Sequence, residues 1–592
     1  MKKILLLLYF AMIAMTSFAS KADQTPITVT QPDGTRLTVI LHGDEYAHWY
    51  TTTDGVLIVQ KQKGFYIAQV TADGGLEGTN QLAHAAANRT QQEKALIRQQ
   101  DKNFFLAVQS KKLGGRNLSE GGFKKIPIRD DSSLFPHTGS PKAIVILVEF
   151  SDTTFSLPNP KASFEQYLNG EGRPVNLGNR EDLNYKSIKE YFKDMSDGAF
   201  VPQFDLYGPY NLNQELKYYG AGMDNMSRLI PDACNAAAAD VDFSQYDSNG
   251  DGRVDLVYII YAGYSQSVTG NSEECIWPKS GAQNFGMWNG KQVYRYGVNN
   301  ELNAFPGAYS SAPYKRINGV GLFVHEFSHT LGLPDLYATQ GSTGENQDNQ
   351  GMEFWSVMDG GTYVNNGYYP TAYTAWERET MGWFMPEILT DTLRVDALAP
   401  IDFGGAAYKI MNDNDATGRE YVMLQNIQLA GWNAKQKGHG LLAYRVNYQR
   451  DNVYLTDNPN NTLGSPQIVV LPADGLLLAQ ANAGSSSEYY SQMAGDPYPG
   501  TSGVDSVNFV MSDGSILQKP VFNIVETTEG FISFDYLGVK KPLPDTIHQL
   551  EDETRQPVDN RIYSIDGNYV GTDAGVLHKG VYIKNRKKII IK

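Results

Sequence analysis

The sequence contains few cysteines. Only Cys234 and Cys275 occur among its 592 residues. Two cysteines cannot form a disulfide framework or a multi-cysteine zinc site. They can pair with each other or stay reduced and buried, and the sequence leaves both options open. Neither lies in the N-terminal third, so no thiol from that part of the chain can block a metal.

Positive charge is also scarce. The chain has 50 Lys and Arg against 65 Asp and Glu, a formal net charge of −15 at pH 7. Recognition of phosphates needs a Lys/Arg surface, so the charge balance argues against nucleic acid as a partner. Aromatic residues make up 11% of the chain, enough to build large cores and to exclude a disordered protein.

Long apolar runs are confined to the N-terminus. Lys2 and Lys3 precede an apolar stretch that ends near Met15, and Ser17-Phe18-Ala19 has the small-x-small spacing of a cleavage site. This pattern predicts a secretory signal peptide over residues 1–19, with an N-terminal anchor as the alternative. No later segment has 18 uninterrupted apolar residues. We therefore expect no membrane span after signal removal and a secreted or cell-surface protein.

The rest of the chain divides into regions that differ in composition and hydrophobic periodicity. Short strands with Asp-Gly turns give way to a polar, helix-prone stretch and a loose linker. Apolar strands that alternate with helix candidates then predict an α/β (α+β) domain, and short strands without helical periodicity predict an all-β sandwich. The predicted parts are a propeptide or N-terminal domain (20–138), a catalytic domain (139–388), a β-sandwich domain (389–540), a linker (541–560) and a short C-terminal β tail (561–592).

A metal-ligand pattern lies between Val324 and Tyr337. His325 and His329 are four residues apart, which places them on one face of a helix. Two imidazoles at this spacing can reach one tetrahedral Zn²⁺. Glu326, adjacent to the first histidine, suits the general base that takes a proton from the attacking water.

A third ligand follows a predicted chain reversal. Gly332 is expected to end the helix in the left-handed conformation, so that Asp335 returns to the metal. Two histidines and one carboxylate leave a fourth position for water, as a catalytic zinc site requires. A buried helix with two satisfied histidines and a non-catalytic zinc site are the alternatives.

The segment HEFSHTLGLPD resembles the metzincin-type extended zinc motif, with Asp335 in place of the commonest third histidine. Residues 354–361, which contain Met358, resemble the Met-turn that lies under the metal in those enzymes. Four further stretches resemble the secreted M6 (immune-inhibitor-A-like) zinc metallopeptidases, and they are residues 43–55, 141–155, 187–200 and 420–447. The resemblance implies a metzincin-like catalytic domain, an N-terminal propeptide and protein or peptide substrates. Gln425 departs from the acidic residue expected in that family.

A second metal signature begins at Asp247. Asp247, Asn249 and Asp251 alternate as in the first half of a calcium loop, and Asp255 occupies its ninth position. Tyr258 replaces the usual twelfth-position glutamate, so another group would have to complete the shell. The pattern predicts a structural Ca²⁺ site, and an acidic turn is the alternative.

Three tyrosines near the motif are candidates for stabilising an oxyanion, namely Tyr337, Tyr363 and Tyr369. Tyr363, which follows the Met-turn, is the preferred one. For inhibition by the propeptide, the available groups are His42, Asp44, Glu45 and His48, or steric occlusion alone. Lys124-Lys125 and Arg129 are candidate maturation sites, and a permanent N-terminal domain is the alternative.

The C-terminal tail resembles the sorting tails of bacterial secreted proteins, which implies secretion machinery as a partner; an ordinary closing hairpin is the alternative. Together these features predict a secreted zinc-dependent endopeptidase made as a zymogen. One rival is a non-catalytic surface adhesin with a vestigial zinc site, and another is a zinc exopeptidase or amidase. The intact Glu326 argues against the adhesin, because a vestigial site needs no base.

Overall fold

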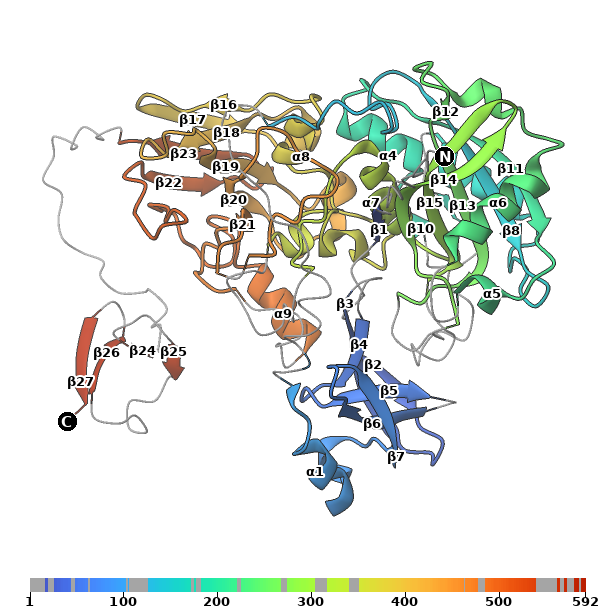
Figure 1. The fold of residues 1–592 in the computed structure, drawn as a ribbon. Helices are drawn as coiled ribbons and strands as arrows, with labels where there is room; N and C mark the ends of the chain where they lie inside the picture. The colour runs from blue at the N-terminus through green and yellow to red at the C-terminus, as the bar shows by residue number, and fades with distance from the viewer. Residues whose placement is uncertain are drawn as a thin grey trace, which may run out of the picture. The chain divides into compact units, whose positions relative to one another are not determined.

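The computed structural model describes most of the chain (Figure 1). The chain forms two compact units, residues 1–539 and residues 540–592. The described residues are 16–19, 26–43, 48–61, 64–102, 105, 126–171, 175–176, 183–220, 225–267, 274–303, 317–339, 351–462, 464–477, 485–538, 562–564, 569–571, 580–584 and 587–591.

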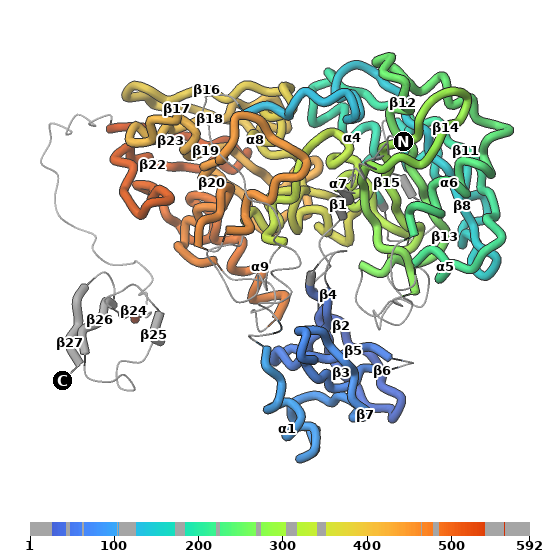
Figure 2. Tube along the Cα trace, in the orientation of Figure 1, coloured from blue at the N-terminus to red at the C-terminus, as the bar shows by residue number. Residues whose placement is uncertain are grey.

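Residues 26–105 begin with a six-stranded antiparallel meander in which each strand pairs with the next (Figure 2). The reversals use Gly34, Gly55 and Gly74, which adopt the positive φ that tight turns demand. The helix-prone stretch after the sheet contains α1 (Gln91–Ile97). The strands are β2 (Ile27–Thr30), β3 (Arg36–Gly43), β4 (His48–Thr52), β5 (Leu57–Lys61), β6 (Gly64–Val70) and β7 (Leu76–Leu82).

The next region is built on a seven-stranded sheet of order β1-β14-β15-β13-β8-β11, with β12 paired to β15. Its centre is parallel, since β8 pairs in parallel with β11 and β13, whereas β14 and β15 form an antiparallel hairpin. Two short strands, β9 and β10, pair separately. The bounds are β1 (Thr16–Ala19), β8 (Lys142–Glu149), β9 (Val175–Asn176), β10 (Leu183–Asn184), β11 (Gln203–Asn211), β12 (Arg253–Val254), β13 (Val257–Tyr264), β14 (Lys279–Trp288) and β15 (Lys291–Leu302).

Helices cover both faces of this sheet. Along β8, Val145 and Leu147 pack with α4 and α7, while Ile144 and Ile146 pack with α6 on the opposite face. Burial of both faces explains why the strand is an uninterrupted apolar run. The predicted mixed α/β organisation is confirmed. The helices described between residues 160 and 380 are α3 (Pro160–Asn169), α4 (Ile188–Met195), α5 (Leu216–Gly220), α6 (Met226–Ala237), α7 (Val320–Leu331) and α8 (Ala375–Thr380).

Residues 126–138, predicted to belong to the N-terminal part, pack against this α/β region. Ile126, Ile128 and Phe135 share the hydrophobic core that contains α7. The Phe135 ring lies edge-on to Phe327 with 5.3 Å between centroids, and its backbone N–H donates to the Thr330 carbonyl. The segment is therefore part of the structure that surrounds α7.

Residues 387–536 contain two further sheets, of order β16-β18-β19-β20-β21 and β17-β23-β22. Side chains on one face of the five-stranded sheet, such as Tyr421 and Met423, join the core around α7. Val422 and Leu424 point the other way and pack with β22 and β23. The strands are β16 (Glu387–Ile388), β17 (Leu393–Leu398), β18 (Ala407–Met411), β19 (Glu420–Ile427), β20 (Gly440–Asn447), β21 (Ile468–Val470), β22 (Val521–Glu526) and β23 (Ile532–Tyr536).

The prediction that this region lacks helices is wrong at α9 (Ser486–Met493). Ser485 caps the helix by accepting from the Glu488 N–H, and Tyr489 and Met493 bury one face. Short 3-10 turns also occur along the chain. Among the described residues they are η1 (Ala86–Asn88), η2 (Phe243–Tyr246), η4 (Glu353–Trp355), η5 (Gly360–Tyr363), η6 (Ile401–Phe403) and η7 (Gly431–Lys435).

The second unit contains the predicted C-terminal β structure, a four-stranded antiparallel sheet of order β25-β24-β26-β27. Its strands are β24 (Ile562–Ser564), β25 (Tyr569–Gly571), β26 (Gly580–Lys584) and β27 (Lys587–Ile591).

Three expectations concern the N-terminus and the cysteines. Residues 1–15 of the predicted signal peptide lie outside the described residues, and 16–19 form β1, which pairs antiparallel with β14. None of the helices in the described ranges is both apolar enough and long enough to span a membrane. Cys234 and Cys275 are both buried free thiols, which answers the question of pairing.

Candidate metal centre

Helix α7 presents the two histidines from inside the core. All twelve of its residues, Val320–Leu331, are buried. Gly332 ends the helix with φ of 111°, the left-handed conformation that the sequence predicts. A Cβ at this position would lie 2.7 Å from Ile128 Cγ2, so packing as well as backbone conformation requires glycine. The chain then reverses and returns Asp335 to the face that carries the histidines.

His325, His329 and Asp335 converge within the core. Each offers one ligand atom, and these atoms lie within 4.8 Å of one another. The Nε2 atoms of both histidines lie 3.3 Å from Asp335 Oδ1, and the two rings are nearly perpendicular. Glu326, the adjacent residue on α7, is fully buried.

Backbone carbonyls determine which ring nitrogen carries the proton in both neutral imidazoles. His325 Nδ1 lies 2.8 Å from the Val357 carbonyl oxygen, and His329 Nδ1 lies 2.7 Å from that of Leu333. A carbonyl oxygen only accepts, so each Nδ1 must donate its proton. In the neutral imidazoles, both Nε2 lone pairs therefore face the Asp335 carboxylate. Three electron-pair donors around one point, with second ring nitrogens anchored in this way, fit a metal ion.

The pKa of Asp335 suits a ligand. Burial raises the pKa of this carboxyl, but the two histidines, when they are protonated, lower it by more through charge and hydrogen bonds, so the net shift is downward. The carboxylate therefore stays ionised at neutral pH, as coordination requires.

The Met-turn connects the ligand-bearing segments. The Val357 carbonyl accepts from His325, and the Met358 carbonyl accepts the backbone N–H of Leu336 at 2.8 Å. Leu336 directly follows Asp335, so two consecutive peptide groups contact the segments of the first and third ligands. Met358 itself is fully buried in the core that contains α7. These carbonyl contacts were missed from the sequence, because backbone acceptors leave no mark in residue identity.

Comparison with known protein families matches the region that contains these residues to one family. Residues 136–385 match the family model described as Immune inhibitor A peptidase M6, catalytic domain. Residues 136–385 are an M6 peptidase domain. By family, the domain is a metallopeptidase.

Two relatives extend the comparison. Immune inhibitor A from Bacillus thuringiensis subsp. alesti is 27% identical over 289 residues, which cover 40% of this chain and 39% of that protein. Pre-pro-metalloprotease PrtV from Vibrio cholerae serotype O1 is 25% identical over 221 residues, covering 33% of this chain and 23% of that protein. The chain thus spans less than half the length of these relatives.

The candidate oxyanion tyrosines differ in burial within the M6 domain. Tyr363 ends η5, just after the Met-turn, and is half-buried against the core. Tyr337 is buried, and Tyr369 stacks on Tyr185 with 5.5 Å between ring centroids. Contact of any of them with a reacting group stays a prediction.

The predicted calcium loop lies between η2 and β13 of the M6 domain. Asp247 Oδ2 accepts from the Gly252 N–H and from Lys291 Nζ, the latter at 2.6 Å, and Asp255 Oδ2 accepts from the Ser248 N–H. Burial raises the pKa of Asp255, and the charges of Asp247 and Asp251 add to this. The loop oxygens thus accept backbone N–H groups, and a lysine pairs with the first carboxylate.

Asn249 and Asp251 complete the loop's turns. Asn249 Oδ1 accepts from the Asp251 N–H, and Asp251 Oδ1 accepts from the Arg253 N–H. Asn249 also donates to the Ser132 carbonyl, which ties the loop to the 126–138 segment. The structure therefore accounts for each residue of the loop as part of a turn, and the calcium assignment stays a prediction.

Two of the proposed inhibitory residues of the N-terminal part are described. His42 is buried and its Nε2 lies 2.8 Å from Thr51 Oγ1 of the neighbouring strand. His48 contacts the M6 domain, with Nε2 3.1 Å from Gln266 Nε2 and its ring 4.8 Å from that of Trp277. Asp44 and Glu45 lie outside the described residues, as do the candidate cleavage residues Lys124 and Lys125.

Gln425, the departure from the expected acidic residue, caps a helix of the M6 domain. Its Oε1 accepts from the backbone N–H of Ala375, the first residue of α8, at 2.8 Å, and from the Tyr444 hydroxyl at 3.1 Å. A neutral amide oxygen satisfies both donors without burying a charge. Gln425 therefore has a structural role at the start of α8.

Proposed function

We propose that the chain is a secreted, zinc-dependent endopeptidase that is made as a zymogen. The observation that carries the proposal is the buried convergence of His325, His329 and Asp335 beside Glu326, within an M6 peptidase domain. The name of the relative PrtV, a pre-pro-metalloprotease, supports a leader and a prosegment. Zinc is the proposed metal because two imidazoles and one carboxylate form a common catalytic zinc set with a position left for water.

The proposed reaction gives each predicted site residue a specific role. The two histidines and Asp335 would hold the metal, which supplies Lewis-acid polarisation of the peptide carbonyl. Glu326 takes a proton from the attacking water and passes it to the leaving amine. Tyr363 is the proposed donor to the developing oxyanion. Met358 supports the centre from the turn that contacts His325.

The test compares the processed wild-type protein with Glu326→Ala on unfolded casein and on an internally quenched peptide blocked at both ends. Zinc content is measured on both proteins. We expect the variant to retain zinc and to lose at least about a hundredfold in rate. Cleavage of the doubly blocked peptide separates an endopeptidase from an exopeptidase. Zinc binding without turnover by the wild type would contradict the proposal and favour the adhesin.

The N-terminal part (20–138) is the proposed prosegment, and the contacts of His48 with Gln266 and Trp277 support its docking on the M6 domain. The sheets of 389–540 are proposed to form the predicted sandwich.

The four-stranded tail within 561–592 is proposed to be recognised by secretion machinery. Its basic residues, which include Lys584, Lys587 and Lys588, contrast with the net negative chain.

Structural calcium at residues 247–255 is a further proposal. Asp247 supports it, since its side chain is 1% exposed and its Oδ1 has no hydrogen-bond partner among the described residues. We expect Ca²⁺ to raise the unfolding temperature, with a gain of about 2.7 kcal/mol at a hundredfold excess over the dissociation constant. Asp255→Asn should abolish the gain, whereas Asp413→Asn, in another acidic turn, should keep it. An unfolding temperature insensitive to Ca²⁺ would leave the loop as an acidic turn.

A further inference from the structure

A buried glutamate outside the zinc motif lies behind the Met-turn. Glu377, on α8, is fully buried, and both of its carboxylate oxygens accept hydrogen bonds. Its Oε2 accepts from the backbone N–H of Thr374 at 2.6 Å and from the Thr374 hydroxyl at 2.9 Å, which caps the helix. Its Oε1 accepts from the Ser356 hydroxyl at 2.5 Å. One carboxylate therefore connects the start of α8 to the start of the Met-turn.

Ser356 transmits this contact to the backbone of the turn. Its Oγ accepts the Met358 N–H at 3.0 Å while it donates to Glu377. Its carbonyl accepts the N–H groups of Asp359 and Gly361, at 3.2 and 2.9 Å. The hydroxyl thus has one acceptor and one donor, and the acceptor for its proton is supplied by Glu377. The carboxylate sets the direction of that hydroxyl and with it the position of the Met358 amide.

The backbone of the same turn contacts both ends of the ligand set. The Val357 carbonyl accepts from His325 Nδ1, and the Met358 carbonyl accepts from the N–H of Leu336, next to Asp335. A displacement of this short segment would tilt the first imidazole and shift the third ligand together. Groups that orient metal ligands in this way are worth about 10–100-fold in metal affinity or activity.

We propose that Glu377 is a positioning residue of the metal centre, acting through the Ser356 hydroxyl on the Val357 and Met358 carbonyls. The inference rests on the proposed function, since it requires that His325, His329 and Asp335 hold a metal. Glu377 touches neither the ligands nor the reacting atoms. It fixes the turn from behind and keeps the Nε2 lone pair of His325 directed at the centre.

The test measures Zn²⁺ affinity of the full chain by competition with a chromophoric chelator. Glu377→Gln keeps the shape of the side chain and one acceptor oxygen, which the helix cap can retain, but places an amide N–H₂ opposite the serine. We expect Zn²⁺ binding about tenfold weaker, and a shifted visible absorption spectrum of the Co²⁺-substituted protein. Ser356→Ala removes the other partner and should weaken binding similarly. The double variant should bind about as well as either single one, because both changes break the same contact.

Glu379→Gln is the matched control, on the same helix and equally a buried carboxylate, but paired with Lys409 Nζ at 2.7 Å. It should keep wild-type Zn²⁺ affinity and the wild-type Co²⁺ spectrum. If Glu377→Gln fails to fold, Ser356→Ala decides, because it removes a single hydroxyl. Wild-type Zn²⁺ affinity in the variants, or losses that multiply in the double variant, would overturn the positioning role alone. A wild-type chain that binds no Zn²⁺ would overturn the proposed function, and this role with it.

Discussion

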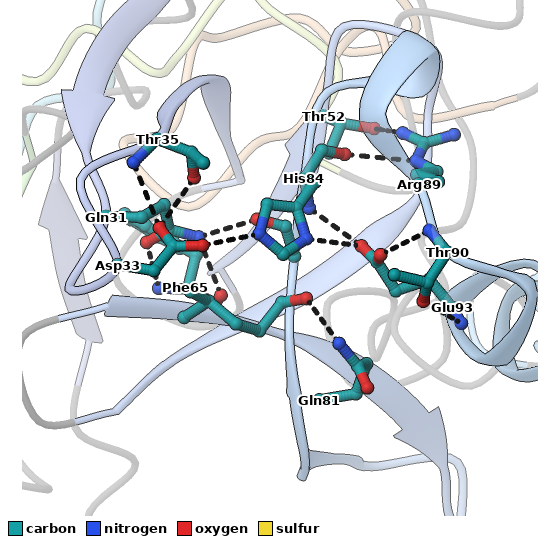
Figure 3. A network of polar contacts seen from close by, with 12 residues as sticks. Gln31, Asp33, Thr35, Thr52, Phe65, Gln81, His84, Arg89, Thr90 and Glu93 are labelled. Carbon is teal, nitrogen blue, oxygen red and sulfur yellow. Dashed lines mark hydrogen bonds and ion pairs between the residues drawn. The ribbon is translucent and has the colours of Figure 1, made fainter.

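At the scale of single residues, His84 lies between two carboxylates in the N-terminal part (Figure 3). Its Nε2 is 2.8 Å from Asp33 Oδ2, and its Nδ1 is 3.0 Å from Glu93 Oε1. Glu93 is fully buried and also accepts from the Thr90 N–H, and Arg89 donates to the His84 carbonyl. Ionised carboxylates only accept, so both ring nitrogens donate only when the imidazole is charged.

We expect the stability of this part of the chain to fall as pH rises. Burial lowers the pKa of His84, but hydrogen bonds to Asp33 and Glu93 raise it by more, so the net shift is upward. The imidazolium's contribution is therefore complete below the unfolded pKa and is lost as pH rises through the folded one. On the acid side, hydrogen bonding from His84 lowers the pKa of Asp33 from 3.8 to about 2, and that contribution is lost as pH falls through this value.

Hydrogen exchange of residues 27–97, corrected for its intrinsic pH dependence, measures this effect. Protection should be lower at about pH 9 than at about pH 6 in the wild type. His84→Gln should flatten the difference, because the amide does not titrate. Parallel pH profiles in the two proteins would contradict the role of His84.

The residue scale also marks the limit of prediction from the sequence. The convergence of His325, His329 and Asp335 could be predicted, because a helix turn and a glycine reversal fix their relation locally. The contact of Glu377 with Ser356 joins residues 21 positions apart through a fold that no local pattern encodes. The cap formed by Gln425 is likewise a long-range contact, 50 positions from Ala375.

At the scale of elements, variants in the segment 126–138 test how far the stably folded part of the M6 domain extends toward the N-terminus. Phe135 is fully buried among α7 and its neighbours, so Phe135→Ala should cost about 3–5 kcal/mol of unfolding free energy. Because its ring also packs edge-on against Phe327 of α7, zinc affinity should fall as well. Chemical denaturation and chelator competition measure the two effects.

Phe105→Ala is the comparison, since Phe105 is also buried but lies edge-on to Trp49 in the N-terminal part. It should destabilise that part and leave zinc affinity unchanged. Equal zinc affinities in both variants would mean that residues 126–138 do not support α7. Loss of Phe135 would then be felt elsewhere.

Two features of the structure escaped the sequence analysis for different reasons. Residues 126–138 have the composition of a linker, and their few apolar residues show no period, so only tertiary packing reveals their place. Helix α9 did carry a local signal, with Ser485 followed by Glu488 three positions later and Tyr489 four before Met493. The expectation of an all-β region outweighed that signal.

At the scale of the molecule, the M6 domain and the sheet of β18, β19 and β20 share one core. The two are also joined by an ion pair between Arg378 on α8 and Asp402 on η6, both less than 10% exposed. Asp402→Ala would leave a buried guanidinium without its carboxylate. We expect a loss of about 3–5 kcal/mol in unfolding free energy, and we expect both regions to unfold in one transition.

Asp396→Ala serves as the control, because Asp396 pairs with Arg394 at a side chain that is 74% exposed. Its effect should stay within about 1 kcal/mol. Calorimetry of both variants, with zinc retention as a second signal, distinguishes the cases. Two separate transitions in the wild type would contradict a shared core.

The placement of Trp277 has an optical consequence. The ring belongs to the M6 domain by sequence, yet it is fully buried in the cluster formed by Leu41, Tyr50 and their neighbours in the N-terminal sheet. Indole emission depends on the polarity around the ring. Separation of the N-terminal part from the M6 domain would transfer this indole from an apolar core to water and shift its emission to longer wavelength. The chain therefore contains its own spectroscopic probe for that separation, without an added label.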